Sequence, residues 1–411
     1  MKQAFNGTAD PPPPTTAAGW RLFALLIAIS SVGPLSVNII VPAIPGLSLA
    51  FAADPAIVQL TVSLYFGGLG LAQLPLGSLS DRFGRRPVLL GGFVVTVLTS
   101  FAAAAATNVI ALVVARTAQA LGASTGIVIG RAIIRDLYTR DRAASMLGWV
   151  TMSVVAVPMF GPLIGGLLEE AWGWRAILLF IGITSLLTLL WAAIALPETR
   201  APSAAGVHSA RRLGKESREL LLTPAFAGFV LCSAMISGPF YTVMGGSAQI
   251  VITLMGRSAT ELGLWLVFAS VGYMAGNFLA GSLSVRYGGS AMLWWGLFLE
   301  LAGTLASALA VSAIPQVGPA AIFVPLFVVY VGNGMALPNA IAGAISVRPE
   351  AIGTASGVTG CVQMGWGAVI SQLIAYPVAD ASSAAPFAWI MFAQALAGVL
   401  FFWVLVRPKH P

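Results

Sequence analysis

Long apolar stretches recur along the whole chain and constrain its fold more than any other feature of the sequence. Hydrophobic residues make up 58% of the 411 residues, whereas charged residues make up only 9%. A soluble domain carries about 25% charged residues and needs them on its surface. About 20 mostly apolar residues suffice to cross a bilayer as a helix, and hydropathy locates such segments. The sequence therefore predicts an all-α membrane protein with twelve transmembrane helices, at 21–44, 56–76, 88–107, 109–133, 143–167, 175–196, 225–250, 260–280, 290–311, 319–343, 353–377 and 386–406.

The first apolar segment is longer than the hydrophobic region of a secretory signal peptide, and no small-residue cleavage site follows it. We therefore expect it to stay as a membrane helix. The two cysteines, Cys232 and Cys361, both fall in apolar stretches, so neither a disulfide framework nor a metal site is expected.

Basic residues concentrate in alternate connections between the predicted spans. If the N-terminus is cytoplasmic, 18 of the 21 Lys and Arg residues fall in cytoplasmic connections or tails. Only Arg175 and Arg257 then lie outside, and Arg116 lies within a span. Because Lys and Arg are enriched in cytoplasmic loops, we expect both termini in the cytoplasm and a multi-pass protein of the cytoplasmic (inner) membrane.

Two copies of one loop sequence, 204 residues apart, indicate an internal duplication. Gly77-Ser-Leu-Ser-Asp-Arg-Phe-Gly follows the second span, and Gly281-Ser-Leu-Ser-Val-Arg-Tyr-Gly follows the eighth. Duplicated bundles around a midplane site are a transporter architecture. The predicted organisation is a disordered cytoplasmic tail (1–19), an N-terminal six-helix bundle (20–198), a cytoplasmic linker with a short amphipathic helix (199–222), a C-terminal six-helix bundle (223–406) and a cytoplasmic tail (407–411).

The first copy of this loop, GxxxDRxGRR at 77–86, resembles the signature of the major facilitator superfamily, and the chain resembles that superfamily over nearly its whole length. The resemblance implies that Asp81 meets the N-terminal dipole of the eleventh span, near Gly353, and helps to close an inner gate. The alternative is that these charges only set topology, although topology alone does not need an acid. Val285 replaces the acid in the second copy, so a weaker gate is expected there. The gating residues predicted on the first loop are Gly77, Asp81, Arg82, Gly84, Arg85 and Arg86.

A second motif of the superfamily, RxxQxxG, matches Arg116, Gln119 and Gly122 in the fourth span. A charge within a span costs about 2.5–3.5 kcal/mol on insertion scales. With Gln119 one turn away, we expect Arg116 to face the transport cavity. The alternative is that Arg116 lies near the outer end and snorkels to the membrane surface. Gly122, Gly126 and Gly130 are expected to form a packing stripe that lets neighbouring helices approach closely.

The fifth span carries PxxGPxxGG at 158–166, which looks like the antiporter motif of proton-coupled drug exporters. Prolines bend a helix and release backbone carbonyls, and glycines allow close packing. Val157 stands where that motif has its leading glycine, and a kinked helix without antiport is the alternative. With the segments 130–137, 196–199 and 337–340, the chain resembles the bicyclomycin/chloramphenicol-resistance (Bcr/CflA-type) subfamily of drug:proton antiporters. Further gating residues predicted here are Pro158, Gly161, Pro162, Gly165 and Gly166.

That subfamily usually carries an acid late in the first span, where this chain has Asn38. Asn38 cannot titrate, but it shares a polar helix face with Ser31 and Pro34 and is expected to hydrogen-bond substrate. Glu300 in the ninth span is then the only carboxylate deep within a predicted span, which makes it a candidate for proton coupling together with Arg116. The alternative is that Glu300 only bonds a neighbouring helix, because the ninth span is peripheral in the family.

A cavity between the two halves is expected to combine aromatic, methionine and amide side chains, since flexible apolar walls accept varied ligands. Each candidate could also be an ordinary packing residue. The predicted substrate-binding residues are Asn38, Tyr65, Arg116, Gln119, Met152, Tyr241, Tyr330, Asn333, Gln363 and Trp366.

These features together predict a secondary active transporter that exports small, partly apolar compounds by alternating access, with proton antiport. Its expected partners are a small-molecule substrate, protons and the lipid bilayer. We expect a monomer. We expect no binding of nucleic acid, because the basic residues lie in short loops rather than on one face. No enzymatic activity, cofactor or metal is expected, since no metal, triad or nucleotide-binding constellation is found. An exporter of sugars, amino acids or purines, and a non-transporting membrane sensor, are the alternatives.

Overall fold

The computed structural model describes residues 17–138, 146, 150, 159–199, 210–313, 318–348, 351–379 and 382–406. This part of the chain is almost entirely helical and contains no strand, so the all-α prediction is confirmed. Eleven of its helices are long and apolar enough to cross a membrane, and they match eleven of the twelve predicted spans. The predicted span at 143–167 lies mostly outside the described residues; its described end, at 159–167, is helical, and the helix continues beyond the predicted span to residue 172.

The described helices form two halves, each built mainly of long helices. The first half contains α1 (Ala17–Asn38), η2 (Val41–Ala43), α2 (Ile44–Phe51), α3 (Pro55–Phe83), α4 (Arg85–Ala104), α5 (Val109–Leu137), the helical residues 159–172, and α7 (Trp174–Ala195). The second half contains α9 (Pro224–Ile236), α10 (Gly238–Ala248), η4 (Gln249–Leu254), α11 (Ala259–Tyr287), α12 (Gly289–Ala313), α13 (Ala320–Ser346), α14 (Ile352–Leu373), α15 (Ala375–Ala379), α16 (Ala385–Phe401) and η6 (Phe402–Val406).

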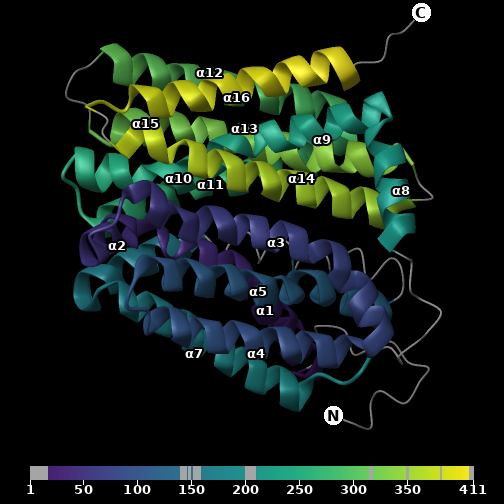
Figure 1. Ribbon diagram of the computed structural model, residues 1–411. Helices are drawn as coiled ribbons and strands as arrows, with labels where there is room; N and C mark the ends of the chain where they lie inside the picture. Colours follow the sequence, from purple (N-terminus) through teal and green to yellow (C-terminus); the bar gives the residue numbers. More distant parts are fainter. Residues whose placement is uncertain are drawn as a thin grey trace, which may run out of the picture.

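Figure 1 shows these halves side by side, with α3 and α14 adjacent along the boundary between them. The helix α8 (Ala210–Leu221) lies within the predicted linker, at the end of the bundle where α1 begins and η6 ends. We call this end the terminus end. The short helices α2 and α15 lie at the opposite end, which we call the far end (Figure 1).

The internal repeat is visible in the backbone of the two equivalent helices α3 and α11, whose first and last residues are each 204 positions apart. Asp54 caps α3 by accepting the Ala56 N–H at 2.7 Å, and Ser258 caps α11 by accepting the Glu261 N–H at 3.1 Å. Both helices end at a glycine with positive φ, 96° at Gly84 and 84° at Gly288, a conformation that glycine adopts without steric cost.

The predicted glycine stripe of α5 is a packing surface. A Cβ on Gly122 would come within 2.5 Å of the Gly92 carbonyl oxygen of α4. A Cβ on Gly126 would overlap the Ile29 carbonyl oxygen of α1. Small residues are favoured at such contacts because lipid provides no hydrophobic driving force, so helices gain stability from close packing.

We expect Gly126→Ala to destabilise the protein, because the added methyl group separates α5 from α1 at a well-packed crossing. Small-to-large changes of this kind cost about 1–3 kcal/mol. The matched control is Gly91→Ala, since Gly91 is exposed on α4 and a Cβ there meets no heavy atom within 4 Å. Thermal unfolding in detergent should show a lower Tm for Gly126→Ala alone; equal Tm values for both variants would contradict the assigned crossing.

Candidate functional site

A central cavity of about 270 Å³ lies between the two halves. Helices of both halves contribute to its wall, so neither half encloses it alone. Its lining residues are Pro34, Val37, Asn38, Phe66, Leu69, Ile127, Met159, Pro162, Ser237, Phe240, Tyr241, Met244, Leu266, Ser270, Tyr273, Tyr330, Asn333, Leu337, Gln363 and Met364.

The wall of this cavity is apolar and aromatic, and its polar groups are neutral. Among the described residues, no Asp, Glu, Lys, Arg or His lines it. Three of its aromatic rings pack together: Tyr241 packs edge-on against Phe66 at 4.9 Å and against Phe240 at 5.3 Å between ring centroids. A charged ligand would therefore have to leave its charge unpaired in a low-dielectric space.

Five of the predicted substrate-binding residues lie on this wall: Asn38, Tyr241, Tyr330, Asn333 and Gln363. Their part in binding substrate stays a prediction. Trp366 lies inside the second half, where its indole N–H donates to the Gln394 side-chain oxygen at 3.3 Å. The predicted residues Met152 and Pro158 fall outside the described part of the chain.

The expectation that Arg116 faces the cavity is wrong, because Arg116 is fully buried within the first half and is not on the wall. Its guanidinium donates to the Ser36 carbonyl oxygen of α1 at 2.8 Å and to the side-chain oxygen of Gln119. Its charge lies 4.3 Å from the Tyr65 ring of α3, and Gln119 donates onward to Ser100 of α4. Tyr65, Arg116 and Gln119 thus form a polar network that joins four helices behind the cavity wall.

Several wall residues were missed from sequence, and the internal repeat relates four of them in two pairs. The 204-residue offset relates Phe66 to Ser270 and Leu69 to Tyr273, and all four line the cavity. Equivalent positions on α3 and α11 face the same space because the halves are related by the duplication. Amide and aromatic composition alone did not reveal these positions.

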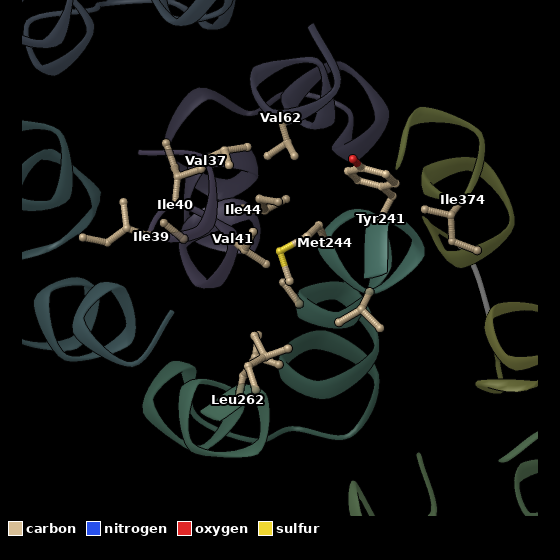
Figure 2. Packing of buried hydrophobic residues seen from close by; sticks show 14 of the residues in the cluster. Val37, Ile39, Ile40, Val41, Ile44, Val62, Tyr241, Met244, Leu262 and Ile374 are labelled. Carbon is tan, nitrogen blue, oxygen red and sulfur yellow. The ribbon is translucent and has the colours of Figure 1, made fainter. Parts of the chain in front are cut away.

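An apolar cluster closes the far end of the cavity. Figure 2 shows Val41 of η2 next to Met244 of α10, and Ile44 of α2 and Leu262 of α11 belong to the same buried apolar cluster. Burial of such side chains contributes roughly 25 cal/mol per Å² of apolar surface. The contact joins both halves and separates the cavity from the far end.

Polar contacts between the halves reinforce this closure. The Glu170 carboxylate accepts the Thr260 backbone N–H at 2.8 Å, at the N-terminus of α11 in the other half. Gln372 of α14 donates to the Ala56 carbonyl oxygen at 2.8 Å and accepts the Ser63 hydroxyl at 2.7 Å. An acid at a helix N-terminus is stabilised by the helix dipole.

The predicted gating glycines at 161–166 also lie at interfaces. A Cβ on Gly161 would lie 3.4 Å from the Asn38 Cβ, and one on Gly165 would overlap the Ile39 carbonyl oxygen. A Cβ on Gly166 would come within 2.5 Å of the Ala259 carbonyl oxygen of the other half. Pro162 lines the cavity.

At the terminus end, the predicted signature loop builds a charged cluster within the first half. Arg85 forms ion pairs with Asp81 at 2.7 Å and with Asp136 at 2.9 Å. Glu198 accepts the backbone N–H groups of Arg85 at 2.9 Å and Arg86 at 3.1 Å, so it caps α4. The segment at 196–199 and the signature loop are therefore one structural unit.

The remaining predicted gating residues of this loop lie around that cluster. Arg86 donates to the Ala193 carbonyl oxygen at 2.6 Å, and Arg82 lies 5.1 Å from the Phe83 ring. A Cβ on Gly77 or on Gly353 would meet no heavy atom within 4 Å. In the first turn of α14, Thr354 donates to the Glu216 carboxylate of α8 at 3.2 Å, and the predicted contact between Asp81 and the N-terminus of α14 stays a prediction.

Glu300 is fully buried in α12 and does not line the cavity. Neither carboxyl oxygen has a hydrogen-bond partner among the described residues, so the expected bond to a neighbouring helix is not found there. Close packing against Gly332 of α13 encloses it. A buried acid without a partner is expensive within a membrane and is a functional candidate.

A helical membrane bundle whose two halves enclose a central cavity is the architecture of a membrane transporter. The chain belongs to the Major Facilitator Superfamily, whose sequence profile matches residues 26–372. The predicted resemblance and the predicted fold class are both confirmed by this match.

Similar proteins place the chain in the bicyclomycin/chloramphenicol-resistance subfamily. It is 31% identical to the chloramphenicol resistance protein of Pseudomonas aeruginosa, over 82% of this chain and 80% of that protein. It is 28% identical to multidrug resistance protein D of Escherichia coli, over 86% and 88% of the two chains. It is 25% identical to the bicyclomycin resistance protein homolog of Haemophilus influenzae, over 93% and 96%.

Solved structures share the fold at low sequence identity. A D-xylose-proton symporter aligns with a TM-score of 0.76 and 15% identity, over 95% of this chain and 98% of that one. An inward-facing, unoccupied bacterial homolog of the human lysosomal transporter Spinster aligns with a TM-score of 0.73 and 16% identity, over the same shares.

We expect Arg116→Lys to destabilise the first half although the charge is kept, because an ammonium cannot reproduce the planar fork that bonds Ser36 and Gln119 together. Loss of a hydrogen bond to a charged group costs about 1.5–3 kcal/mol. The control is Arg175→Lys, an exposed arginine 4.2 Å from the Trp174 ring. Thermal unfolding in detergent compares the two, and an unchanged Tm for Arg116→Lys would contradict the network.

We also expect far-end packing to weaken as pH rises. Glu169 lies just beyond the predicted fifth span and packs against Gly46 of α2, and this burial raises the pKa of its carboxyl from 4.5 to about 7. Because the pKa of Glu169 is raised in the folded protein, its contribution to the free energy of unfolding is complete below about pH 4.5 and is lost as pH rises through about 7.

Glu169→Gln should therefore remove a fall in Tm over that pH range. Glu170→Gln is the control, because the Thr260 N–H lowers the pKa of Glu170 and its contribution is lost in acid instead. A pH profile of Tm that Glu169→Gln leaves unaltered would refute this assignment.

Proposed function

We propose that this protein exports small, neutral, partly apolar drug-like compounds across the cytoplasmic membrane, by alternating access coupled to proton antiport. The central cavity carries the proposal: it lies between two pseudo-equivalent halves, is lined by aromatic and methionine side chains, and has no charged side chain among its described lining residues. Flexible apolar walls with a few polar groups accept varied ligands. The names of the relatives, which refer to multidrug, chloramphenicol and bicyclomycin resistance, support the same substrate class.

The neutral wall argues against amino acids as the exported compounds. A zwitterion would place an ammonium and a carboxylate in a space without a charged partner among the described residues. Sugars and purines are neutral, and their many polar groups fit a largely apolar wall less well than a compound with an apolar body does.

The arrangement described above corresponds, in this proposal, to the inward-facing state. The contacts between the halves close the far end, which is then the outer side, and both termini are cytoplasmic. In the outward-facing state the Glu170–Thr260 contact opens, and Asp81 exchanges part of its interaction with Arg85 for the N-terminus of α14. An acid near a helix N-terminus gains about 0.3–1 kcal/mol, which is enough to bias two states of similar energy.

Glu300 is the proposed proton carrier, since Asn38 replaces the acid of the first span. It lies in α12, which packs on α13, and α13 carries the cavity residues Tyr330 and Asn333. A change in the protonation of Glu300 would act on the cavity through that helix contact, because Glu300 does not touch the substrate space itself.

The test uses inverted membrane vesicles and an export-deficient host. Expression should raise resistance to chloramphenicol, and vesicles should take up chloramphenicol when an inward-acid gradient is applied. Glu300→Gln should abolish this gradient-driven uptake while counterflow survives, because glutamine fills the same volume and carries no titratable group. Glu219→Gln, which changes an exposed acid of α8, is the control.

Each outcome separates the candidate functions. Uptake without proton movement would indicate a facilitator, and binding without uptake would indicate a sensor. Gradient-driven uptake by Glu300→Gln equal to that of the parent would refute the role of Glu300, and Asn38→Asp would then test whether an acid in α1 increases the dependence on the gradient.

A further inference from the structure

Two asparagines on the cavity wall have their amide orientation determined by the backbone. Asn38 donates from Nδ2 to the Pro34 carbonyl oxygen at 2.7 Å, and Asn333 donates from Nδ2 to the Ile236 carbonyl oxygen at 2.5 Å. A carbonyl oxygen can only accept, so the nitrogen of each amide faces the protein. The side-chain oxygen of each is therefore on the opposite side.

A relay determines the orientation of the third amide, Gln363. Its Nε2 lies within hydrogen-bond distance of the Ser237 hydroxyl oxygen. That hydroxyl donates its own hydrogen to the Ser233 carbonyl oxygen at 2.9 Å. Ser237 thus has no hydrogen left for Gln363, which has to be the donor. The Gln363 side-chain oxygen is turned away from this relay.

The three amide oxygens are available acceptors. No described group donates to the side-chain oxygen of Asn38, Asn333 or Gln363, and none of these oxygens is among the buried atoms that lack a partner. Asn38 and Asn333 are only 4% and 3% exposed, so the little accessible surface that they have is at the cavity they line.

Two further hydroxyl hydrogens of the wall are already used. Ser270 donates to the Leu266 carbonyl oxygen at 2.8 Å, and Tyr241 donates to the Met364 sulfur at 3.6 Å. With Ser237 also engaged, these groups offer the cavity lone pairs rather than hydrogens. The Tyr330 hydroxyl, which has no partner among the described residues, and the second N–H of each amide remain as donors.

We propose that this cavity selects its substrates by hydrogen-bond donors: it binds neutral compounds with an aromatic or apolar body and at least two hydroxyl or amide N–H groups. The donors bond to the oxygens of Asn38, Asn333 and Gln363, and the apolar body packs against Phe66, Phe240 and Tyr241. This inference rests on the proposed function and names the substrate chemistry that the cavity recognises. Compounds that carry only acceptors leave the amide oxygens without partners, which costs affinity.

The experiment measures the binding of a matched ligand pair to the full-length purified protein by isothermal titration calorimetry. The probes are chloramphenicol, which carries two hydroxyls and one amide N–H, and its di-O-methyl derivative, which keeps the skeleton and lacks both hydroxyl donors. Each neutral hydrogen bond contributes about a three- to tenfold change in affinity. Chloramphenicol should bind at least about tenfold more tightly than the derivative.

Two protein variants assign the effect to the amides. Asn333→Leu and Asn38→Leu keep the side-chain size and remove the acceptor, and each should weaken chloramphenicol binding about three- to tenfold while the affinity for the derivative changes less than about twofold. The matched control is Asn339→Leu, because Asn339 lies on α13 and bonds the Met335 carbonyl oxygen in the same way but is not on the cavity wall. It should alter the affinity for neither compound.

The outcomes separate this inference from the proposed function. Equal affinity for the two compounds would overturn donor selection and leave drug binding in place. An equal loss for both compounds in Asn333→Leu would also overturn it, because that result indicates lost packing rather than a lost acceptor. Binding of neither compound would count against the proposed function and would overturn this inference with it.

Discussion

The hydrocarbon core of a bilayer offers no water to polar groups, and the structure of this chain follows from that constraint. Backbone groups are satisfied within helices, and buried polar side chains have to find partners inside the protein. Arg116 is the strongest case. Its charge is buried completely, and the Ser36 carbonyl, Gln119 and the Tyr65 ring surround it. The resulting network joins α1, α3, α4 and α5, so a buried polar cluster holds these four helices together in the first half.

The same electrostatic contact, an acid at a helix N-terminus, is used in two different places. Glu198 caps α4 within the first half, where it joins two segments that keep their positions relative to each other. Glu170 caps α11 across the boundary between the halves, and the proposed alternating access would break and remake this contact. A contact of this kind suits a gate because it is directional and is worth only a small multiple of thermal energy. Glu169 beside it responds to pH in the opposite sense, so acid favours one far-end contact and disfavours the other.

The duplication accounts for the shared helix arrangement of the two halves, and sequence divergence between the copies accounts for their different side chains. The caps and terminal glycines of α3 and α11 are equivalent, so both helices present the same turns to the cavity. Yet Phe66 and Leu69 on α3 correspond to Ser270 and Tyr273 on α11, which makes the second half the more polar wall. Likewise Asp81 corresponds to Val285, which is 92% exposed. Among the described residues, the charged loop cluster therefore belongs to the first half, and the two halves differ at this equivalent loop.

The sequence by itself determined the membrane class, eleven of the spans, the duplication and the family, because each depends on local composition or on short motifs. Apolar length predicts a spanning helix whatever its neighbours are, and Gly84 and Gly288 end their helices through their own backbone conformation. The tertiary structure decided which polar residues reach the cavity. Arg116 and Asn38 look alike as polar groups within spans, but Arg116 points into the first half and Asn38 lines the cavity. That difference depends on helix rotation and on partners such as the Ser36 and Pro34 carbonyls. Such partners come from helix packing and from backbone carbonyls that no sequence pattern marks, and they also decided which atom of each cavity amide is bonded to the protein.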